Sequence, residues 1–271
     1  MTATTNTTAR ERFDPPRLIG MIHAGALPGT PGHRSSIDEL IDAALRDARA
    51  LAGAGFDGII VENMHDAPYV HGDRLGPEIT AAMTRIVSAV RSEWSGPLGV
   101  QILSGGNRAA LACCLATGAE FIRCENFVYA HVADEGLLPE AEAGPLLRYR
   151  RQIGAERVAI LTDLKKKHAS HAVTADVSIG DAAEAAEFFG SDGFIVTGGF
   201  TGQAASFADL EEVRTRSSLP LLVGSGVTPA SVNDTLRLAD AVIVGSWIKR
   251  GGDWRNPVDP ARAAELVQAA G

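Results

Sequence analysis

The feature that most constrains the fold is a regular alternation of short apolar runs with longer amphipathic stretches. The stretches between the runs have the periodicity of helices that bury one face. The eight runs lie at residues 18–23, 56–63, 98–103, 121–126, 157–163, 193–198, 220–226 and 240–246. This alternation predicts repeated βα units and a parallel sheet.

Eight such units in a chain of 271 residues favour a single (β/α)8 TIM barrel over an open doubly wound sheet. No G-x-G-x-x-G sequence follows the first run, which disfavours the dinucleotide-binding alternative. The opening residues, MTATTNTTARER, are polar and lack the apolar core of a signal peptide. We therefore expect a disordered tail over residues 1–16 and one barrel domain over residues 17–271.

Helix start signals stand between several of the runs. Ser36 is followed three residues later by Glu39, which is the pattern of a capping box. Thr228 and Asp259 each precede a proline, and proline is favoured at the first position of a helix. We expect helices to begin at these three places.

Composition excludes several classes of protein. The 33 acidic residues outnumber the 25 basic ones, and the resulting net charge of −8 disfavours binding to nucleic acid. No apolar run approaches the roughly 18 residues of a membrane span, so we expect no membrane insertion. The three cysteines have neither metal-ligand nor disulfide spacing, which is typical of a cytoplasmic protein.

Polar side chains follow the runs at the carboxyl ends of the predicted strands, where barrels carry their catalytic groups. His23 ends the first run and Asp163 the fifth, on opposite sides of an eight-stranded ring. An acid and a base that face each other across a sugar suit isomerisation or cleavage of a glycosidic or carbon–carbon bond. We expect Asp163, His23 and Glu62 to be catalytic. The structural alternative is that His23 binds a loop and Asp163 caps a helix.

Further polar residues at the strand ends and in the following loops are candidates for contact with substrate. An arginine between carboxylates indicates either a structural ion pair or recognition of an anionic ligand, and the sequence leaves both open. The histidines and carboxylates of the loops match no zinc signature. A divalent cation such as Mg²⁺ stays an open alternative. The candidate substrate-binding residues are Asn63, Gln101, Arg123, Glu125, Lys165 and His168.

Small residues end the last three runs and predict a phosphate site. Glycine lets backbone N–H groups approach a ligand closely, and a helix beginning at Thr228 would add its positive end. Phosphate-binding barrels place this site after the seventh and eighth strands. The competing interpretation is that these glycines only make tight turns. The candidate residues are Thr197, Gly198, Gly199, Gly224, Ser225, Gly226, Gly245 and Ser246.

Several stretches resemble one family over nearly the whole chain. They include "MIHAGALPGTP", "GFDGIIVENMHDAPY", "ILTDLKKKHASH", "DGFIVTGGFTG", "PLLVGSGVTPASV" and "DAVIVGSWIKRGGDWRNPVDPAR". The family is BtpA/SgcQ, named for a photosystem I biogenesis protein and a sugar-operon protein. The resemblance implies a barrel of the ribulose-phosphate-binding type.

Two functions of different classes follow. The first is an enzyme that acts by acid/base chemistry on a phosphorylated sugar or nucleoside-like metabolite, and polar strand ends favour it. The second, which the family name suggests, is a non-catalytic assembly or stability factor for a larger complex. Barrels of this kind often pair, so a homo-oligomer is compatible with either.

Overall fold

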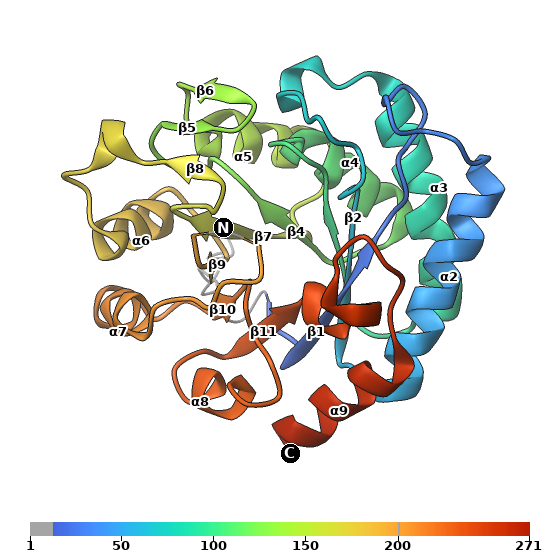
Figure 1. Ribbon diagram of the computed structural model, residues 1–271. Coiled ribbons are helices and arrows are strands. Elements are labelled where there is room, and N and C mark those ends of the chain that lie inside the picture. Colours follow the sequence, from blue (N-terminus) through green and yellow to red (C-terminus); the bar gives the residue numbers. More distant parts are fainter. Residues whose placement is uncertain (1–12, 200) are drawn as a thin grey trace, which may run out of the picture.

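A computed structural model describes residues 13–199 and 201–271 of the protein. Eight parallel strands close into one barrel in the order β1-β11-β10-β9-β7-β4-β3-β2, which confirms the predicted fold. Helices surround the strands (Figure 1). The barrel strands are β1 (Leu18–His23), β2 (Gly58–Glu62), β3 (Leu98–Gln101), β4 (Phe121–Cys124), β7 (Ala159–Leu164), β9 (Gly193–Val196), β10 (Leu221–Val223) and β11 (Ala241–Val244).

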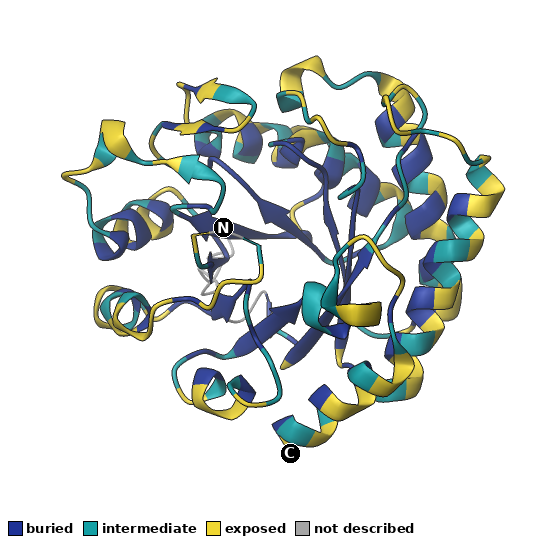
Figure 2. Cartoon of the chain, in the orientation of Figure 1, coloured by how far each residue is buried: buried dark blue, intermediate teal, exposed yellow. Residues whose placement is uncertain are grey.

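The helices bury one face against the strands, and Figure 2 shows buried strands inside a ring of helices with exposed outer faces. No helix within the described residues combines the length and the apolar character that a membrane crossing requires. The helices are α2 (Ile37–Ala54), α3 (Pro77–Glu93), α4 (Asn107–Thr117), α5 (Ala143–Gln152), α6 (Ile179–Phe188), α7 (Phe207–Arg216), α8 (Val232–Leu236) and α9 (Pro260–Ala270).

Two of the three predicted helix starts are confirmed. Ser36 and Glu39 form the capping box of α2, and the Asp259 carboxylate caps α9. The third prediction is wrong, because α8 begins at Val232. The backbone N–H of Thr228 donates instead to the Ser231 hydroxyl at 3.1 Å, which closes a turn before the helix. The predicted phosphate site therefore has no helix that begins at Thr228.

The barrel interior is filled by apolar side chains that alternate with helix-facing ones along each strand. Phe13 closes the amino-terminal end, where its ring lies 5.0 Å from that of Phe121. Phe13 and Pro16 are both buried, so residues 13–16 of the predicted tail pack against the barrel. Residues 1–12 of that tail lie outside the described residues. The interior side chains are Phe13, Ile19, Met21, Ile60, Phe121, Ala159, Leu161, Ile195, Leu222, Ala241 and Ile243.

A small antiparallel sheet lies outside the barrel and was not predicted. Its strands are β5 (His131–Ala133), β6 (Gly136–Leu138) and β8 (Ala169–Ser170), in the order β6-β5-β8. Short 3-10 helices interrupt the other loops; they are η1 (Gly72–Arg74), η2 (Ala172–Thr174), η3 (Ser246–Ile248) and η4 (Arg250–Gly252). Strands this short carry too few residues to show a period of two in the sequence.

Candidate functional site

Two adjoining cavities open at the carboxyl ends of the barrel strands. The first, of about 170 Å³, lies over β10 and β11 and is called the glycine cavity here. The second, of about 300 Å³, lies over β2, β4 and β7 and is called the charged cavity. Because they have walls in common, one small metabolite can occupy both. The shared residues are Glu62, Met64, Arg123, Lys167 and Thr201.

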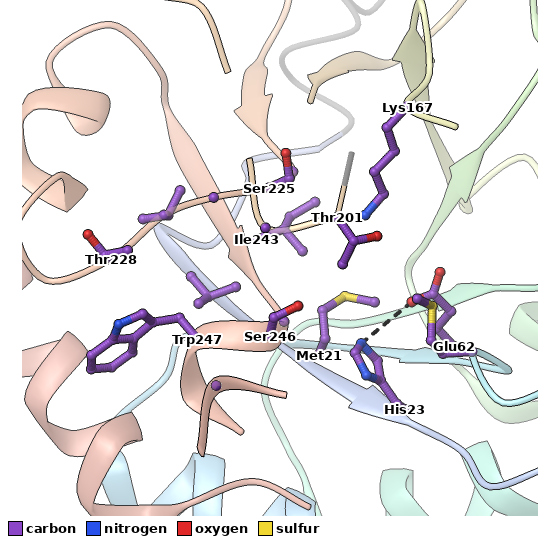
Figure 3. A pocket seen from close by; sticks show the side chains of 18 of the residues that line it. Met21, His23, Glu62, Lys167, Thr201, Ser225, Thr228, Ile243, Ser246 and Trp247 are labelled. Carbon is purple, nitrogen blue, oxygen red and sulfur yellow. Dashed lines mark ion pairs between the residues drawn. The ribbon is translucent and has the colours of Figure 1, made fainter. Parts of the chain in front are cut away.

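Glycines and polar side chains line the glycine cavity together, and Figure 3 shows the side chains of His23, Glu62 and Lys167 beside it. The N–H groups of Gly226, Val227, Gly245 and Ser246 donate to no acceptor among the residues that the structure describes. Unsatisfied N–H groups on residues that line one cavity are candidate donors to an anion, without any helix terminus. Gly224, Ser225, Gly226, Gly245 and Ser246, five of the eight predicted phosphate-binding residues, line this cavity.

One of these glycines is required by the local geometry. Gly226 has a φ of +71°, and a Cβ there would lie 2.3 Å from the backbone nitrogen of Ala204. A Cβ at Gly245 would lie 3.4 Å from Nε2 of His23, which is an ordinary van der Waals contact. A side chain at Gly226 would therefore displace the cavity wall, whereas Gly245 leaves room for a small one.

The other three predicted phosphate residues, Thr197, Gly198 and Gly199, do not line the cavity. The Thr197 hydroxyl accepts the backbone N–H of Lys167 at 3.2 Å, and the Gly198 N–H donates to the Ser225 hydroxyl at 2.8 Å. The Gly199 carbonyl accepts the N–H of His168 at 3.2 Å. These hydrogen bonds join the neighbouring loops, and direct contact of the three residues with a phosphate stays a prediction.

In the charged cavity, Arg123 and Asp163 form a buried bidentate ion pair. Nε and a terminal nitrogen of Arg123 each donate to an Asp163 oxygen at 2.9 Å, and only 1% of the Asp163 side chain is exposed. Burial opposes the charged form of Arg123, but the Asp163 carboxylate outweighs it and raises the pKa of the guanidinium. Of the two interpretations of Arg123, this geometry supports the structural ion pair. Both Asp163 oxygens thus accept hydrogen bonds from Arg123, and a role of Asp163 in proton transfer stays a prediction.

A second ion pair ties the small sheet to the mouth. Lys166 donates to Glu125 and to Glu135, each at 3.2 Å, and Glu135 lies in the turn between β5 and β6. Burial would raise the pKa of Glu125, but the Lys166 ammonium and the N–H of Gly105 lower it overall. Glu125 thus lines the cavity as a paired carboxylate.

Glu62 lines both cavities, and His23 lines the glycine cavity beside it. Their pKa values are shifted in opposite directions. Nδ1 of His23 donates to the Trp254 carbonyl at 2.8 Å, so Nε2 of the neutral ring carries the lone pair. Nε2 lies 3.7 Å from a Glu62 oxygen, and both side chains are more than nine-tenths buried. Burial lowers the pKa of His23 well below its usual range, and the Lys249 ammonium lowers it further. Burial also raises the pKa of Glu62, which favours its protonated form.

Lys167 lines both cavities, although the sequence singled out Lys165 as the substrate contact. Lys165 has a φ of +45°, and this turn sends it to a separate small cavity behind the β4 and β7 loops. Burial lowers the pKa of Lys167, and the Arg123 guanidinium lowers it further. Spacing could not separate three consecutive lysines, because the chain leaves the regular strand at Leu164.

The remaining predicted substrate contacts divide into two groups. Gln101 and His168 line the charged cavity, and the buried Oε1 of Gln101 has no hydrogen-bond partner within the described chain. Nε2 of His168 lies 2.8 Å from the Thr201 hydroxyl. Asn63 is fully buried outside both cavities, where it donates to Asp66 at 2.7 Å and accepts from the Leu103 N–H at 2.7 Å. Asn63 therefore joins the ends of β2 and β3, and its contact with substrate stays a prediction.

The described residues include no group of three or more histidine, cysteine, aspartate or glutamate side chains arranged to hold a metal ion. Among the described carboxylates at the mouth, Asp163 is paired with Arg123, and Glu125 and Glu135 are paired with Lys166.

Known proteins resemble this chain in sequence and in fold. A mitochondrial protein of Caenorhabditis elegans without assigned function is 43% identical over 93% of this chain and 92% of its own. The photosystem I biogenesis protein BtpA of Synechocystis is 34% identical over 93% of this chain and 87% of its own.

Solved structures are similar at a lower level of sequence identity. Tryptophan synthase of Mycobacterium tuberculosis has a TM-score of 0.60 and 18% identity, covering 97% of this chain and 95% of that one. A 3-hexulose-6-phosphate synthase has a TM-score of 0.56 and 16% identity, covering 94% and 100%. At this identity the likeness shows the barrel fold alone. The BtpA family profile matches residues 15–271, and the chain belongs to the BtpA family.

Proposed function

We propose that this protein is an enzyme that moves protons on a small phosphorylated metabolite, in an isomerisation or in cleavage of a glycosidic or carbon–carbon bond. The observation that carries the proposal is the pair of His23, which lines the glycine cavity, and Glu62, which lines both cavities. A neutral imidazole and a protonated carboxyl, both favoured by burial, are a base and an acid available together.

The glycine cavity is the proposed phosphate site. Its unsatisfied N–H groups supply donors, and Glu62, the single carboxylate in its described lining, is biased by burial toward its neutral form. A phosphate held there places the rest of a small sugar over the border and into the charged cavity. Gln101, with its unpartnered oxygen, is suited to accept a hydrogen bond from a sugar hydroxyl.

In the proposed reaction, Nε2 of His23 removes a proton from a carbon next to a carbonyl. The Glu62 carboxyl delivers a proton to the carbonyl oxygen, and the roles reverse when product forms. Asp163 holds Arg123 in place of acting as the acid, since both of its oxygens are bonded. The structural neighbour 3-hexulose-6-phosphate synthase is named for a sugar phosphate, which agrees with this substrate class.

Hydrogen–deuterium exchange tests the proposal. Ribulose 5-phosphate, ribose 5-phosphate, dihydroxyacetone phosphate and glyceraldehyde 3-phosphate are each incubated with the protein in D2O. Proton NMR follows the signal of the carbon next to the carbonyl. We expect catalysed exchange for at least one compound, slowed by about 10²-fold or more in Glu62→Gln and in His23→Gln.

The matched controls change the same residue types outside the cavities. Glu93 is in an exposed ion pair on α3, and His33 bonds the Ala26 carbonyl in a loop, so Glu93→Gln and His33→Gln should retain full exchange. Exchange that survives in both cavity variants, or that appears with none of the four compounds, contradicts the proposal. The latter result would favour the alternative suggested by the Synechocystis relative, a non-catalytic role in assembly of a larger complex.

A further inference from the structure

We propose that the amine of Lys167 forms an imine with the carbonyl carbon of a phosphorylated aldose or ketose. The inference rests on the proposed function and narrows its substrate class to sugar phosphates that have a free aldehyde or ketone. It also gives a role to a group that the proton transfer by His23 and Glu62 does not use.

The first support is the position of Lys167 relative to the two lysines before it. Lys165 lies at a different cavity, and Lys166 is held between Glu125 and Glu135 at 3.2 Å from each. Nζ of Lys167 makes no hydrogen bond or ion pair with any residue that the structure describes. In Figure 3 its side chain enters the cavity and its amine points inward. A ligand that spans both cavities therefore passes this amine.

The second support is the environment of the amine. An ammonium is a poor nucleophile, and an amine becomes one when burial and a neighbouring cation favour loss of its proton. Both factors act on Lys167, because it is partly buried and the Arg123 guanidinium lines the same two cavities. The carboxylates of Glu62, Asp163 and Glu125 act in the opposite direction, but two of these three are already in ion pairs.

The side chains of Lys167 and Glu62 supply the protons that imine formation needs. Nζ attacks the carbonyl carbon, and one amine proton moves to the carbonyl oxygen to give a carbinolamine. The Glu62 carboxyl, which lines the same two cavities, then gives its proton to the hydroxyl, and the carbon–oxygen bond breaks to release water. A protonated imine and a Glu62 carboxylate remain. The imine withdraws electrons from the adjacent carbon, whose proton His23 is placed to remove.

Borohydride trapping tests the proposal directly. The full-length protein is mixed with each of the four carbonyl compounds named above, and sodium borohydride is added to reduce any imine to a stable secondary amine. Intact mass spectrometry is expected to show one adduct per chain, equal to the sugar phosphate less water plus two hydrogens. Peptide mapping is expected to place it on Lys167.

Three comparisons make the trapping specific. Ribitol 5-phosphate has no carbonyl and should give no adduct, while unphosphorylated ribulose should give at least tenfold less. Lys167→Arg should abolish the adduct. Lys165→Arg, the matched control from the same loop, should leave it unchanged.

The proposal is overturned if an adduct persists in Lys167→Arg, is spread over surface lysines, or forms with none of the carbonyl compounds. Thermal shifts with ribitol 5-phosphate then separate the two proposals. If that compound still stabilises the protein while nothing is trapped, the phosphate site stands and the imine is excluded. If it neither stabilises nor is any sugar trapped, the phosphate site falls as well.

Discussion

The two sides of the barrel mouth differ in how their polar groups are paired. At the ends of β10 and β11, the glycine cavity has backbone N–H groups that no described residue accepts. At the ends of β4 and β7, the charged cavity has Arg123, Asp163 and Lys166, which are already paired with one another or with glutamates. Under the proposed function, the anion binds on the side of the mouth that has fewer charged side chains. The groups proposed to act there are the backbone amides of the glycine cavity and the side chains of His23, Glu62 and Lys167.

The largest effect on stability is expected when the buried ion pair of the charged cavity is broken. Asp163→Asn removes the partner of a buried guanidinium, and we expect the free energy of unfolding to fall by about 3–5 kcal/mol. Urea unfolding at neutral pH measures it. Arg123→Met combined with Asp163→Leu should recover most of the loss, because an apolar pair leaves no unpaired charge.

The matched control is an ion pair of similar geometry on the surface. Arg49 donates to both oxygens of Glu93 at 2.7 and 2.6 Å, with 61% of the arginine side chain exposed. Glu93→Gln should cost less than about 1 kcal/mol. Equal losses at the buried and exposed pairs would show that Asp163 is not part of the framework.

A smaller effect is expected on the glycine side, where two glycines provide a matched comparison. Gly226 and Gly202 both line the cavity with positive φ, +71° and +84°. A Cβ at Gly226 would overlap the Ala204 backbone, whereas a Cβ at Gly202 would have nothing within 4 Å. Gly202→Ala should cost about 1–2 kcal/mol from the backbone alone. Gly226→Ala should cost at least about 1 kcal/mol more.

Thermal unfolding of the two alanine variants checks this order. Gly226→Ala should also weaken the binding of ribitol 5-phosphate by tenfold or more, because the shifted backbone misaligns the N–H groups. If both variants have the same stability and the same affinity, the close approach at Gly226 has no part in the site.

The sequence predicted the barrel well because strand periodicity and helix signals are local. All eight apolar runs overlap barrel strands, and their alternate residues such as Met21, Ile60 and Leu161 form the interior. The start of α8 was misplaced because Thr228 and Pro229 satisfy the rules for a helix start and those for a turn equally well. Strands β5, β6 and β8 were not predicted because they are only two or three residues long.

The site was less predictable, because partners at the mouth come from distant parts of the chain. Asp163 and His23 were placed correctly at strand ends, but the sequence does not show that Arg123 binds both oxygens of Asp163. Asn63 and Lys165 point away from the cavities because of a hydrogen bond to Leu103 and a positive φ. Neither feature has a sequence signature of its own.

The most direct test of the account is a thermal-shift comparison of each phosphorylated sugar with its unphosphorylated counterpart, using ribitol 5-phosphate against ribitol as the reference pair. A ligand at a hundred times its Kd adds about 2.7 kcal/mol, which raises the Tm by roughly 5–10 °C for a domain of this size. We predict this rise for the phosphorylated member of a pair and none for its counterpart. Equal shifts within every pair, or no shift with any compound, would contradict a phosphate site at the ends of β10 and β11.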